Sequence, residues 1–255
     1  MHLEELRFVE LVRNYFLKNR HLKILEVGSY DVNGSIRGFF HDSDYIGVDM
    51  CKGPGVDFVG SGHLIDFPEE SFDLTISCEC FEHNPYWHET FINMHRMTKK
   101  DGLVVVSCAS RGRPEHGTSR TNPDESPGTQ SAGINYYQNL NAIDFKRRID
   151  LSSLFSKYKF YYASKPRDLY FIRWKSNSKN AEFDFNNFEK EISEINNIQK
   201  KIPLTIKTPF SYIYKMPILI SMYLMNDINY QNFIIWYSKL MYQPKIYIKK
   251  LLKFN

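Results

Sequence analysis

The sequence predicts an α/β fold built on a doubly wound, mostly parallel sheet. Short apolar runs typical of buried strands alternate with segments whose apolar residues recur at helical spacing. The first run, residues 24–27, enters a turn at Gly28, and a second run ends on a lone acidic residue, Asp49. Because ligands of such sheets bind outside the carboxyl ends of the strands, a site is expected at this edge.

The elements of this sheet follow one another along the first half of the chain. Residues 3–20 carry apolar side chains at helical spacing, which predicts an amphipathic helix before the first strand. Strands are expected near residues 23–27, 45–48, 56–59, 74–77 and 103–107. Between the last two strands a helical face is expected, followed by the turn signal Asp101-Gly102; its apolar members are Trp87, Phe91, Met94 and Met97.

Two late strands and a change of composition complete the predicted organisation. Residues 160–163 and 169–174, joined by Ser-Lys-Pro-Arg-Asp, are typical of an antiparallel pair. From Ser176 onward Asn, Lys, Ile and Tyr dominate and the strand pattern disappears. We therefore expect one domain over residues 1–175 and a mainly helical C-terminal extension over 176–255, which covers the ligand pocket, dimerises or docks on a surface. Prolines should interrupt this extension at Pro203, Pro209, Pro217 and Pro244.

Composition sets limits on the class of protein. With 255 residues, 42% of them hydrophobic, the chain can bury one sizeable core and an appendage. Its start is not typical of a signal peptide, and the longest apolar stretch, residues 216–224, is too short to span a bilayer. The four cysteines form no Cys-x-x-Cys pair, so we interpret them as reduced packing residues. A soluble, cytoplasmic protein is expected.

The net charge of +4 is concentrated in a basic tail over residues 245–254, where lysines alternate with apolar residues. Such a tail is compatible with weak contact to an anionic membrane surface or with nucleic-acid binding. We favour a terminal helix with a solvated basic face, and so expect no nucleic-acid partner. The oligomeric state stays open.

The turn after the first strand has the features of a nucleoside-cofactor site. Glycine lets a backbone approach a ligand closely, and an acidic residue at the end of the second strand can accept hydrogen bonds from two ribose hydroxyls. Asp49 is therefore the candidate ribose ligand. Tyr30 and Val32 occupy positions where a dinucleotide fingerprint has glycines, which makes nicotinamide and flavin cofactors less favoured.

Four motifs together resemble those of the class I S-adenosylmethionine-dependent methyltransferases. They are Glu26-Val27-Gly28, Asp49, the run Phe72-Asp73-Leu74 leading through Cys78 to Glu82-His83, and Asp101-Gly102 before the run that ends at Ser107. The resemblance covers roughly residues 20–175 and implies a seven-stranded sheet, S-adenosylmethionine as cofactor and S-adenosylhomocysteine as product. It implies cofactor contacts at Glu26, Gly28, Ser29, Tyr30, Gly34, Asp49, Met50, Ser61, Gly62, His63 and Cys78.

Within that family, two segments are similar to a bacterial subgroup, methyltransferase type 11-like, that is often associated with surface-polysaccharide or secondary-metabolite modification. They are residues 27–35, Val-Gly-Ser-Tyr-Asp-Val-Asn-Gly-Ser, and residues 53–57, Gly-Pro-Gly-Val-Asp. The chain departs from the family at Ser61-Gly62-His63, where many relatives read Gly-Asp-Ala and the aspartate meets the adenine amino group. Ser61 cannot supply that charge.

Residues 110–129 form a polar, Pro- and Gly-rich stretch that should leave the catalytic edge of the sheet. Long loops in compact domains are usually functional, and we interpret this one as a lid over the acceptor; a merely solvated loop is the alternative. Its arginines, Arg111, Arg113 and Arg120, suit a phosphate or carboxylate on a small-molecule acceptor, or surface ion pairs with neighbouring acids equally well. Tyr136 and Tyr137 fit stacking on a base or sugar, or packing.

His116 on this loop and His83 after the fourth strand are the candidate catalytic residues. Transfer of a methyl group to a hydroxyl requires removal of its proton, and histidine titrates near neutral pH. The structural alternatives are an orienting role for His83 and a surface position for His116. His88 and His95 are expected on the following helix, where we interpret them as surface or packing residues. No His-x-x-x-His pair backed by carboxylates occurs, so no metal is expected.

The leading hypothesis is an O-methyltransferase that acts on an activated sugar or another phosphate-bearing precursor of a bacterial surface polysaccharide. A close alternative is methylation of a phosphoryl or phosphoramidate oxygen in capsule modification, which needs no base because that oxygen is already anionic. Alternatives of another class are a nucleic-acid-binding protein and a cofactor-binding protein without turnover.

Overall fold

The computed structural model describes residues 2–17, 20–155, 158–175, 185–195 and 208–251. The chain falls into two compact units, residues 1–200 and 201–255. The strands of the first unit are β1 Lys23–Val27, β2 Asp44–Asp49, β3 Phe58–Val59, β4 Phe72–Cys78, β5 Thr98–Ala109, β6 Phe160–Ala163 and β7 Asp168–Trp174. Its α-helices are α1 Leu3–Phe16, α2 Trp87–Met97, α3 Pro127–Ser131, α4 Ala142–Arg148, α5 Leu151–Leu154 and α6 Phe185–Ile195, with 3-10 turns η1 Arg37–Phe40, η2 Phe81–His83 and η3 Pro123–Glu125.

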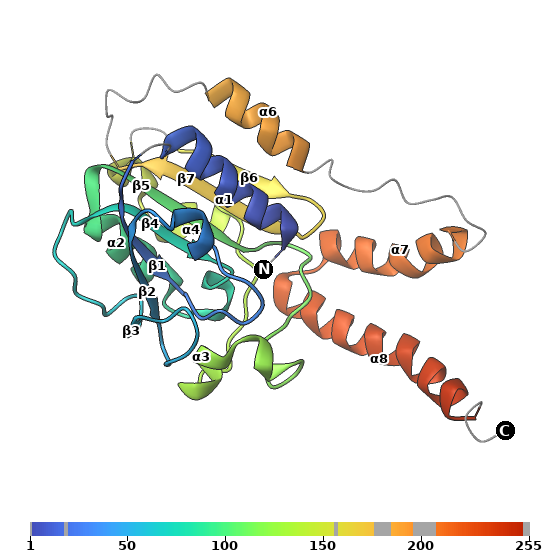
Figure 1. Ribbon diagram of the computed structural model, residues 1–255. Helices are drawn as coiled ribbons and strands as arrows, with labels where there is room; N and C mark the ends of the chain where they lie inside the picture. The colour runs from blue at the N-terminus through green and yellow to red at the C-terminus, as the bar shows by residue number, and fades with distance from the viewer. Residues whose placement is uncertain (1, 18–19, 156–157, 176–184, 196–207, 252–255) are drawn as a thin grey trace. The chain divides into compact units, whose positions relative to one another are not determined.

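The seven strands form one sheet in the order β3-β2-β1-β4-β5-β7-β6, which confirms the predicted fold class (Figure 1). Strands β1 to β5 are parallel, and β7 pairs antiparallel with both β5 and β6. The order reverses between β1 and β4, which creates a crevice at the carboxyl ends of these two strands. Since Asp168 pairs with Ala109, the amino end of β7 lies at this same edge.

A separate apolar core covers each face of the sheet. On one face α1 and α6 pack against alternate strand residues such as Ile24, Ile76 and Val105. On the other face α2, α4 and α5 pack against their neighbours, among them Leu25 and Val106. Alternation of the two sets along each strand is the pattern expected for a sheet with helices on both sides, and it leaves the strand ends free to carry polar groups.

Two local expectations from the sequence differ from the structure. The turn signal Asp101-Gly102 lies inside β5 rather than before it: α2 ends at Met97 and the strand begins at Thr98. The register shifts between the Phe72 and Leu74 positions of β4, so residues 99–102 bulge out of the ladder, as a glycine-containing bulge does. The loop expected over residues 110–129 also contains η3 and the start of α3.

The second unit contains α7 Thr208–Leu224 and α8 Asp227–Leu251. The two helices pack on each other through Met222, Tyr230 and Ile234. The expected interruptions at Pro217 and Pro244 are not seen, because α7 and α8 run through these positions; Pro209 lies in the first turn of α7, where proline is tolerated. Pro203 lies outside the described residues. Within the described part of the chain, every helix is too short or too polar to cross a membrane.

Phe91 on α2 is the central aromatic residue of the second core. Its ring contacts those of Phe81, Phe145, Phe155 and Phe171. Replacing Phe91 with Ala leaves a cavity among these rings, so we expect the free energy of unfolding in urea to fall by about 3–5 kcal/mol. The neighbouring Ile92 is exposed, and Ile92→Ala should change it by less than about 0.5 kcal/mol. Equal losses in the two variants would contradict this packing.

Candidate active site

The turn after β1 brings the backbone close to the crevice and requires glycine at position 28. Gly28 has φ +85°, and its N–H donates to the Val48 carbonyl of β2 at 2.8 Å. A Cβ atom added there would lie 2.4 Å from Cβ of Cys80, on the loop after β4. The two strand ends on either side of the crevice therefore touch, and no side chain can stand between them.

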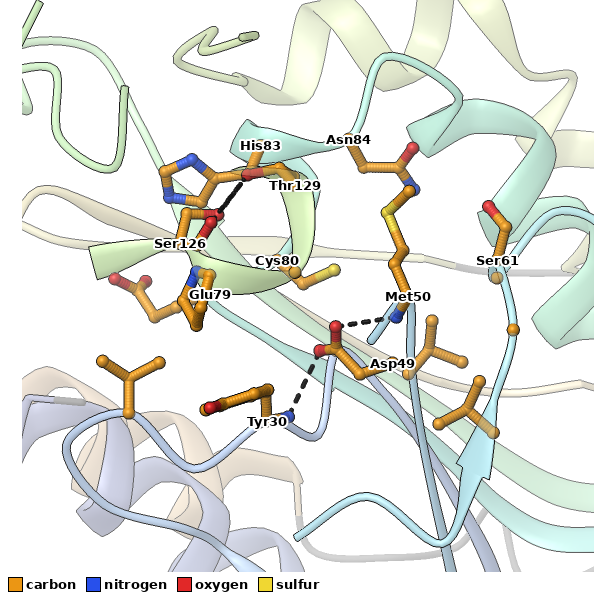
Figure 2. A pocket seen from close by; sticks show the side chains of 18 of the residues that line it. Tyr30, Asp49, Met50, Ser61, Glu79, Cys80, His83, Asn84, Ser126 and Thr129 are labelled. Carbon is orange, nitrogen blue, oxygen red and sulfur yellow. Dashed lines mark hydrogen bonds between the residues drawn. The ribbon is translucent and has the colours of Figure 1, made fainter. Parts of the chain in front are cut away.

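Asp49 ends β2 and turns its carboxylate into the crevice (Figure 2). The N–H groups of Tyr30 and Met50 donate to it at 3.2 and 2.7 Å, which fixes its orientation. Burial raises the pKa of Asp49, while these backbone donors oppose the shift. The carboxylate keeps lone pairs to accept ribose hydroxyls, as the sequence predicted for this residue.

Two adjoining cavities meet at the crevice. The smaller, of about 90 Å³, surrounds the Asp49 carboxylate, and the larger, of about 670 Å³, lies toward the β1 turn and the loop after β5. Residues common to both are Gly28, Tyr30, Val32, Glu79, His83 and Glu125. This arrangement suits an elongated cofactor with its nucleoside beside Asp49 and its reacting end toward the larger cavity.

Most of the predicted cofactor residues line one of these cavities. Met50, Ser61 and Gly62 line the smaller one, and Glu26, Ser29, Gly34 and Cys78 line the larger. His63 lines neither: its Nδ1 is 2.9 Å from Oγ of Ser61, and its ring stacks on Tyr86 at 4.2 Å. In this arrangement His63 holds Ser61 in place.

Glu26 is a buried carboxyl group beneath the larger cavity. Burial raises the pKa of Glu26 to about 7, and the Tyr45 hydroxyl, which donates to it at 2.7 Å, opposes the shift. At neutral pH the group is close to half ionised, so a positively charged ligand above it would favour its anionic form.

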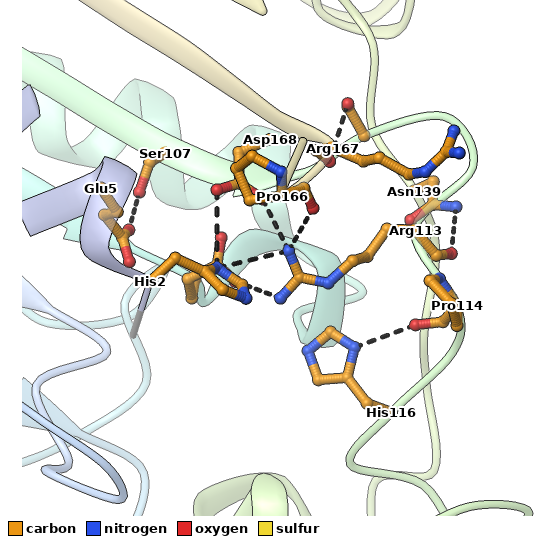
Figure 3. A network of polar contacts seen from close by, with 12 residues as sticks. His2, Glu5, Ser107, Arg113, Pro114, His116, Asn139, Pro166, Arg167 and Asp168 are labelled. Carbon is orange, nitrogen blue, oxygen red and sulfur yellow. Dashed lines mark hydrogen bonds and ion pairs between the residues drawn. The ribbon is translucent and has the colours of Figure 1, made fainter. Parts of the chain in front are cut away.

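Arg113 connects the loop after β5 to two strand ends (Figure 3). Its guanidinium donates to Glu79 after β4 at 2.9 Å and to Asp168 of β7 at 2.7 Å, and it also reaches the Pro166 carbonyl at 2.6 Å. Burial alone would lower the pKa of Arg113, but the two carboxylates raise it. The charge of Arg113 is thus compensated by two carboxylates of the protein. The guanidinium is not offered to a phosphate on the acceptor, which is the role that the sequence allowed.

The other residues predicted to bind the acceptor lie outside both cavities. Arg120 forms an ion pair with Glu115 at 3.3 Å, which is the alternative that the sequence left open. Arg111 lines neither cavity. The Tyr136 hydroxyl donates to Gln138 at 2.6 Å, and the Tyr137 hydroxyl to Asn139 at 3.0 Å. Both hydroxyls thus form hydrogen bonds within the segment that follows the loop.

His83 and His116, the predicted catalytic pair, do meet. Their Nε2 atoms are 3.3 Å apart, and the Tyr137 ring packs against both imidazoles, with centroids 5.4 and 5.0 Å away. Burial lowers the pKa of His83 to about 3, with contributions from His116 and Arg113. Burial, with Arg113, also lowers the pKa of His116. Both rings are therefore neutral at neutral pH.

Sequence reasoning assigned no role to several residues that line the cavities: His2, Glu79, Cys80 and Asn84. Residues 125–129, which also line them, were expected only as part of the loop over residues 110–129. Glu79 and Cys80 lay within a motif that the resemblance used, directly after β4, so their position at a strand's carboxyl end was the available signal. Nothing in the sequence indicates His2. It reaches the site because α1 begins beside Asp168, at the amino end of β7.

Comparison with known proteins agrees with this geometry. Residues 42–106, from before β2 into β5, match the family described as methyltransferase domain. No protein of curated function matches the chain.

Solved structures give weaker likenesses. The 1,6-didemethyltoxoflavin-N1-methyltransferase of Burkholderia thailandensis shares 15% identity over 69% of this chain and 79% of its own, with a TM-score of 0.48. An S-adenosylmethionine-dependent methyltransferase of Mesorhizobium loti shares 15% over 63% and 94%, with a TM-score of 0.41. The PH0226 protein of Pyrococcus horikoshii OT3 shares 14% over 67% and 91%, with a TM-score of 0.45.

The sheet order, the glycine turn beside an acidic strand end, and the match of residues 42–106 to a methyltransferase domain are the features expected of a class I methyltransferase. The two cavities at the β1–β4 crevice are where a nucleoside cofactor such as S-adenosylmethionine would fit.

Replacing Asp49 with Asn should weaken cofactor binding. The variant loses charge-assisted hydrogen bonds to the ribose, so we expect calorimetry to show about 10- to 100-fold lower affinity for S-adenosylhomocysteine. Asp44→Asn is the matched control, because Asp44 begins the same strand with an exposed side chain. Equal affinity of the Asp49 variant and the wild type would refute the ribose contact.

Glu26→Gln should stabilise the cofactor-free protein more at pH 8 than at pH 5. An acid whose folded pKa is raised to about 7 from 4.5 binds more protons in the folded state between these values, so wild-type stability falls as pH rises through that window. Glutamine does not titrate, and the advantage of the variant should grow by roughly 2 kcal/mol between the two pH values in urea unfolding. A pH-independent difference would show that Glu26 is not held in this way.

Proposed function

We propose that the protein transfers the methyl group to a hydroxyl of a sugar, in an activated precursor of a bacterial surface polysaccharide. The observation that supports a hydroxyl acceptor is the neutral His83–His116 pair on the wall of the larger cavity. The saccharide rests on the sequence resemblance alone.

The geometry of the pair selects His116 as the base. Its Nδ1 lies 3.2 Å from the Pro114 carbonyl, which can only accept a hydrogen bond, so Nδ1 carries the proton and Nε2 carries the lone pair. A pKa of about 3 makes His83 a weak base, and we assign it the orienting role.

The charges around the larger cavity favour a neutral acceptor oxygen. Its lining includes four carboxylic acids and one arginine; the acids are Glu26, Glu79, Glu115 and Glu125, and the arginine is Arg113. An anionic phosphoryl or phosphoramidate oxygen would be repelled here. A phosphate elsewhere on the acceptor would have to lie outside this lining.

When bound, the cofactor would supply the methyl group on a sulfonium, which is transferred by an in-line displacement. The protein therefore has to align the acceptor oxygen, exclude water and take one proton. Asp49 and the β1 turn hold the cofactor on one side, and His116 faces the cavity on the other side.

The substrate class is tested by incubating the protein with labelled S-adenosylmethionine and a panel of nucleotide-activated sugars, free sugars and phosphoryl compounds. Mass spectrometry should show the gain of one methyl group on a sugar hydroxyl. Methylation of a phosphoryl oxygen would support the capsule-modification alternative instead. Binding of the cofactor without S-adenosylhomocysteine formation on any acceptor would favour a non-catalytic role.

His116→Ala should reduce turnover with a hydroxyl acceptor by about 100-fold or more, because the base is lost, and should leave S-adenosylhomocysteine affinity unchanged. His88→Ala, on α2 and paired with Glu89, is the control and should keep full turnover. A small loss in the His116 variant would show that the acceptor needs no base.

A further inference from the structure

Glu82 has a carboxyl group that the proposed reaction does not use. The residue lies in η2, directly after β4, and is fully buried. Neither of its side-chain oxygens has a hydrogen-bond partner of ordinary geometry in the described part of the chain, and its own N–H is the one backbone group that assists it. A buried, unpartnered acid of this kind calls for a compensating cation.

Ring nitrogens of His83 and His116 lie close to the carboxyl group of Glu82. One ligand atom from each of Glu82, His83 and His116 lies within 4.8 Å of the others. Hydrogen bonds between nitrogen donors and acceptors centre near 2.9–3.0 Å, so the Nε2–Nε2 separation of 3.3 Å is long for one. Two nitrogens bound to one zinc ion at about 2.0–2.1 Å, at a tetrahedral angle, are separated by about 3.3–3.4 Å.

The groups behind the imidazoles also resemble those of metal ligands. A metal-binding histidine usually donates its other ring N–H to a carbonyl or carboxylate, which fixes the ring. Nδ1 of His116 has such a partner in the Pro114 carbonyl at 3.2 Å. Nδ1 of His83 is buried and has no hydrogen-bond partner of ordinary geometry in the described part of the chain. The Tyr137 ring packs against both imidazoles and restricts their rotation.

A second cluster of donors shows what a compensated site looks like. His2, Glu79 and Asp168 also bring three ligand atoms within 4.8 Å of one another. There the Arg113 guanidinium already binds both carboxylates, at 2.9 and 2.7 Å, and supplies the cation. Among the described residues, no cationic side chain forms a hydrogen bond with the Glu82 carboxyl group. The cation present in the second cluster is therefore missing from the first.

We propose that Glu82, His83 and His116 bind a divalent metal ion of the zinc type. Two histidines, one glutamate and an open position form the donor set of catalytic zinc sites. Side-chain rotation of Glu82 would bring the three donors to bonding distance. His83 and His116 line the larger cavity, so the open position faces the space where the acceptor binds. With the ion bound, the Nε2 lone pair of His116 would be taken by the metal, and the ion would assist loss of the acceptor's proton in place of the free imidazole. This role rests on the function proposed above, whereas binding of the ion does not.

The test is titration of zinc chloride into the chelator-treated full chain by calorimetry. We expect one ion per chain, and affinity more than about 100-fold lower in Glu82→Gln and in His116→Ala. His88→Ala removes a surface histidine paired with Glu89 and should bind zinc as the wild type does. Cobalt(II) bound to the wild type should show the intense visible absorption of a four-coordinate ion, and the two ligand variants should not.

Binding of S-adenosylhomocysteine by each variant shows that it is folded. No zinc binding by the wild type, or equal binding by the wild type, Glu82→Gln and His116→Ala, would overturn the metal site while leaving methyl transfer to a hydroxyl intact. Zinc binding that follows the expected order, together with no methylation of any hydroxyl acceptor, would overturn the proposed function and leave the metal site standing.

Discussion

The functional edge of this protein depends on the contact between one guanidinium and two carboxylates. Arg113, from the loop after β5, binds Glu79 at the end of β4 and Asp168 at the start of β7. Asp168 is fully buried, and burial raises the pKa of Glu79 to about 6 even with Arg113 beside it. Losing one member of such a buried pair typically costs about 3–5 kcal/mol, because the other charge is left uncompensated. The same contact fixes the start of the loop that carries His116, so stability and the position of the candidate base have one origin.

The acid-rich lining of the crevice suits the charge of the cofactor. Burial raises the pKa of Glu26 to about 7 and also raises that of Asp49. A site with several desolvated acids is costly when empty and favourable for a cation. S-adenosylmethionine carries a sulfonium and an ammonium group against one carboxylate, whereas its demethylated product has lost the sulfonium charge. The field at this edge therefore favours the cofactor over the product, and it disfavours an anionic acceptor oxygen for the same physical reason.

The features that the sequence predicted are those that depend on a local pattern of residues. The strand runs, the glycine at position 28 and the acid at position 49 follow from periodicity and from the needs of one turn, and the structure confirms the fold that they predict. The roles of the loop arginines could not be predicted, because the partner of Arg113 at position 168 is 55 residues away and reaches it only through the β5–β7 pairing. The turn signal at Asp101-Gly102 was misplaced because a bulge in a long strand uses the same residues as a turn. The proposed grouping of Glu82 with His116 likewise depends on tertiary structure and has no signature in sequence spacing.

The start of α3 covers the nucleoside end of the candidate site. Ligand pockets for small molecules usually measure about 300–1,000 Å³, but the cavity around Asp49 measures about 90 Å³. Its cover is the start of α3, where a Cβ atom on Gly128 would lie 2.3 Å from the Asp49 carboxylate. Residues 110–131 are thus anchored at one end by Arg113 and close over the ribose ligand at the other end. Gln130 of α3 donates to the Gly117 carbonyl at 3.0 Å, so the cover of the ribose ligand is tied to the part of the loop that carries His116.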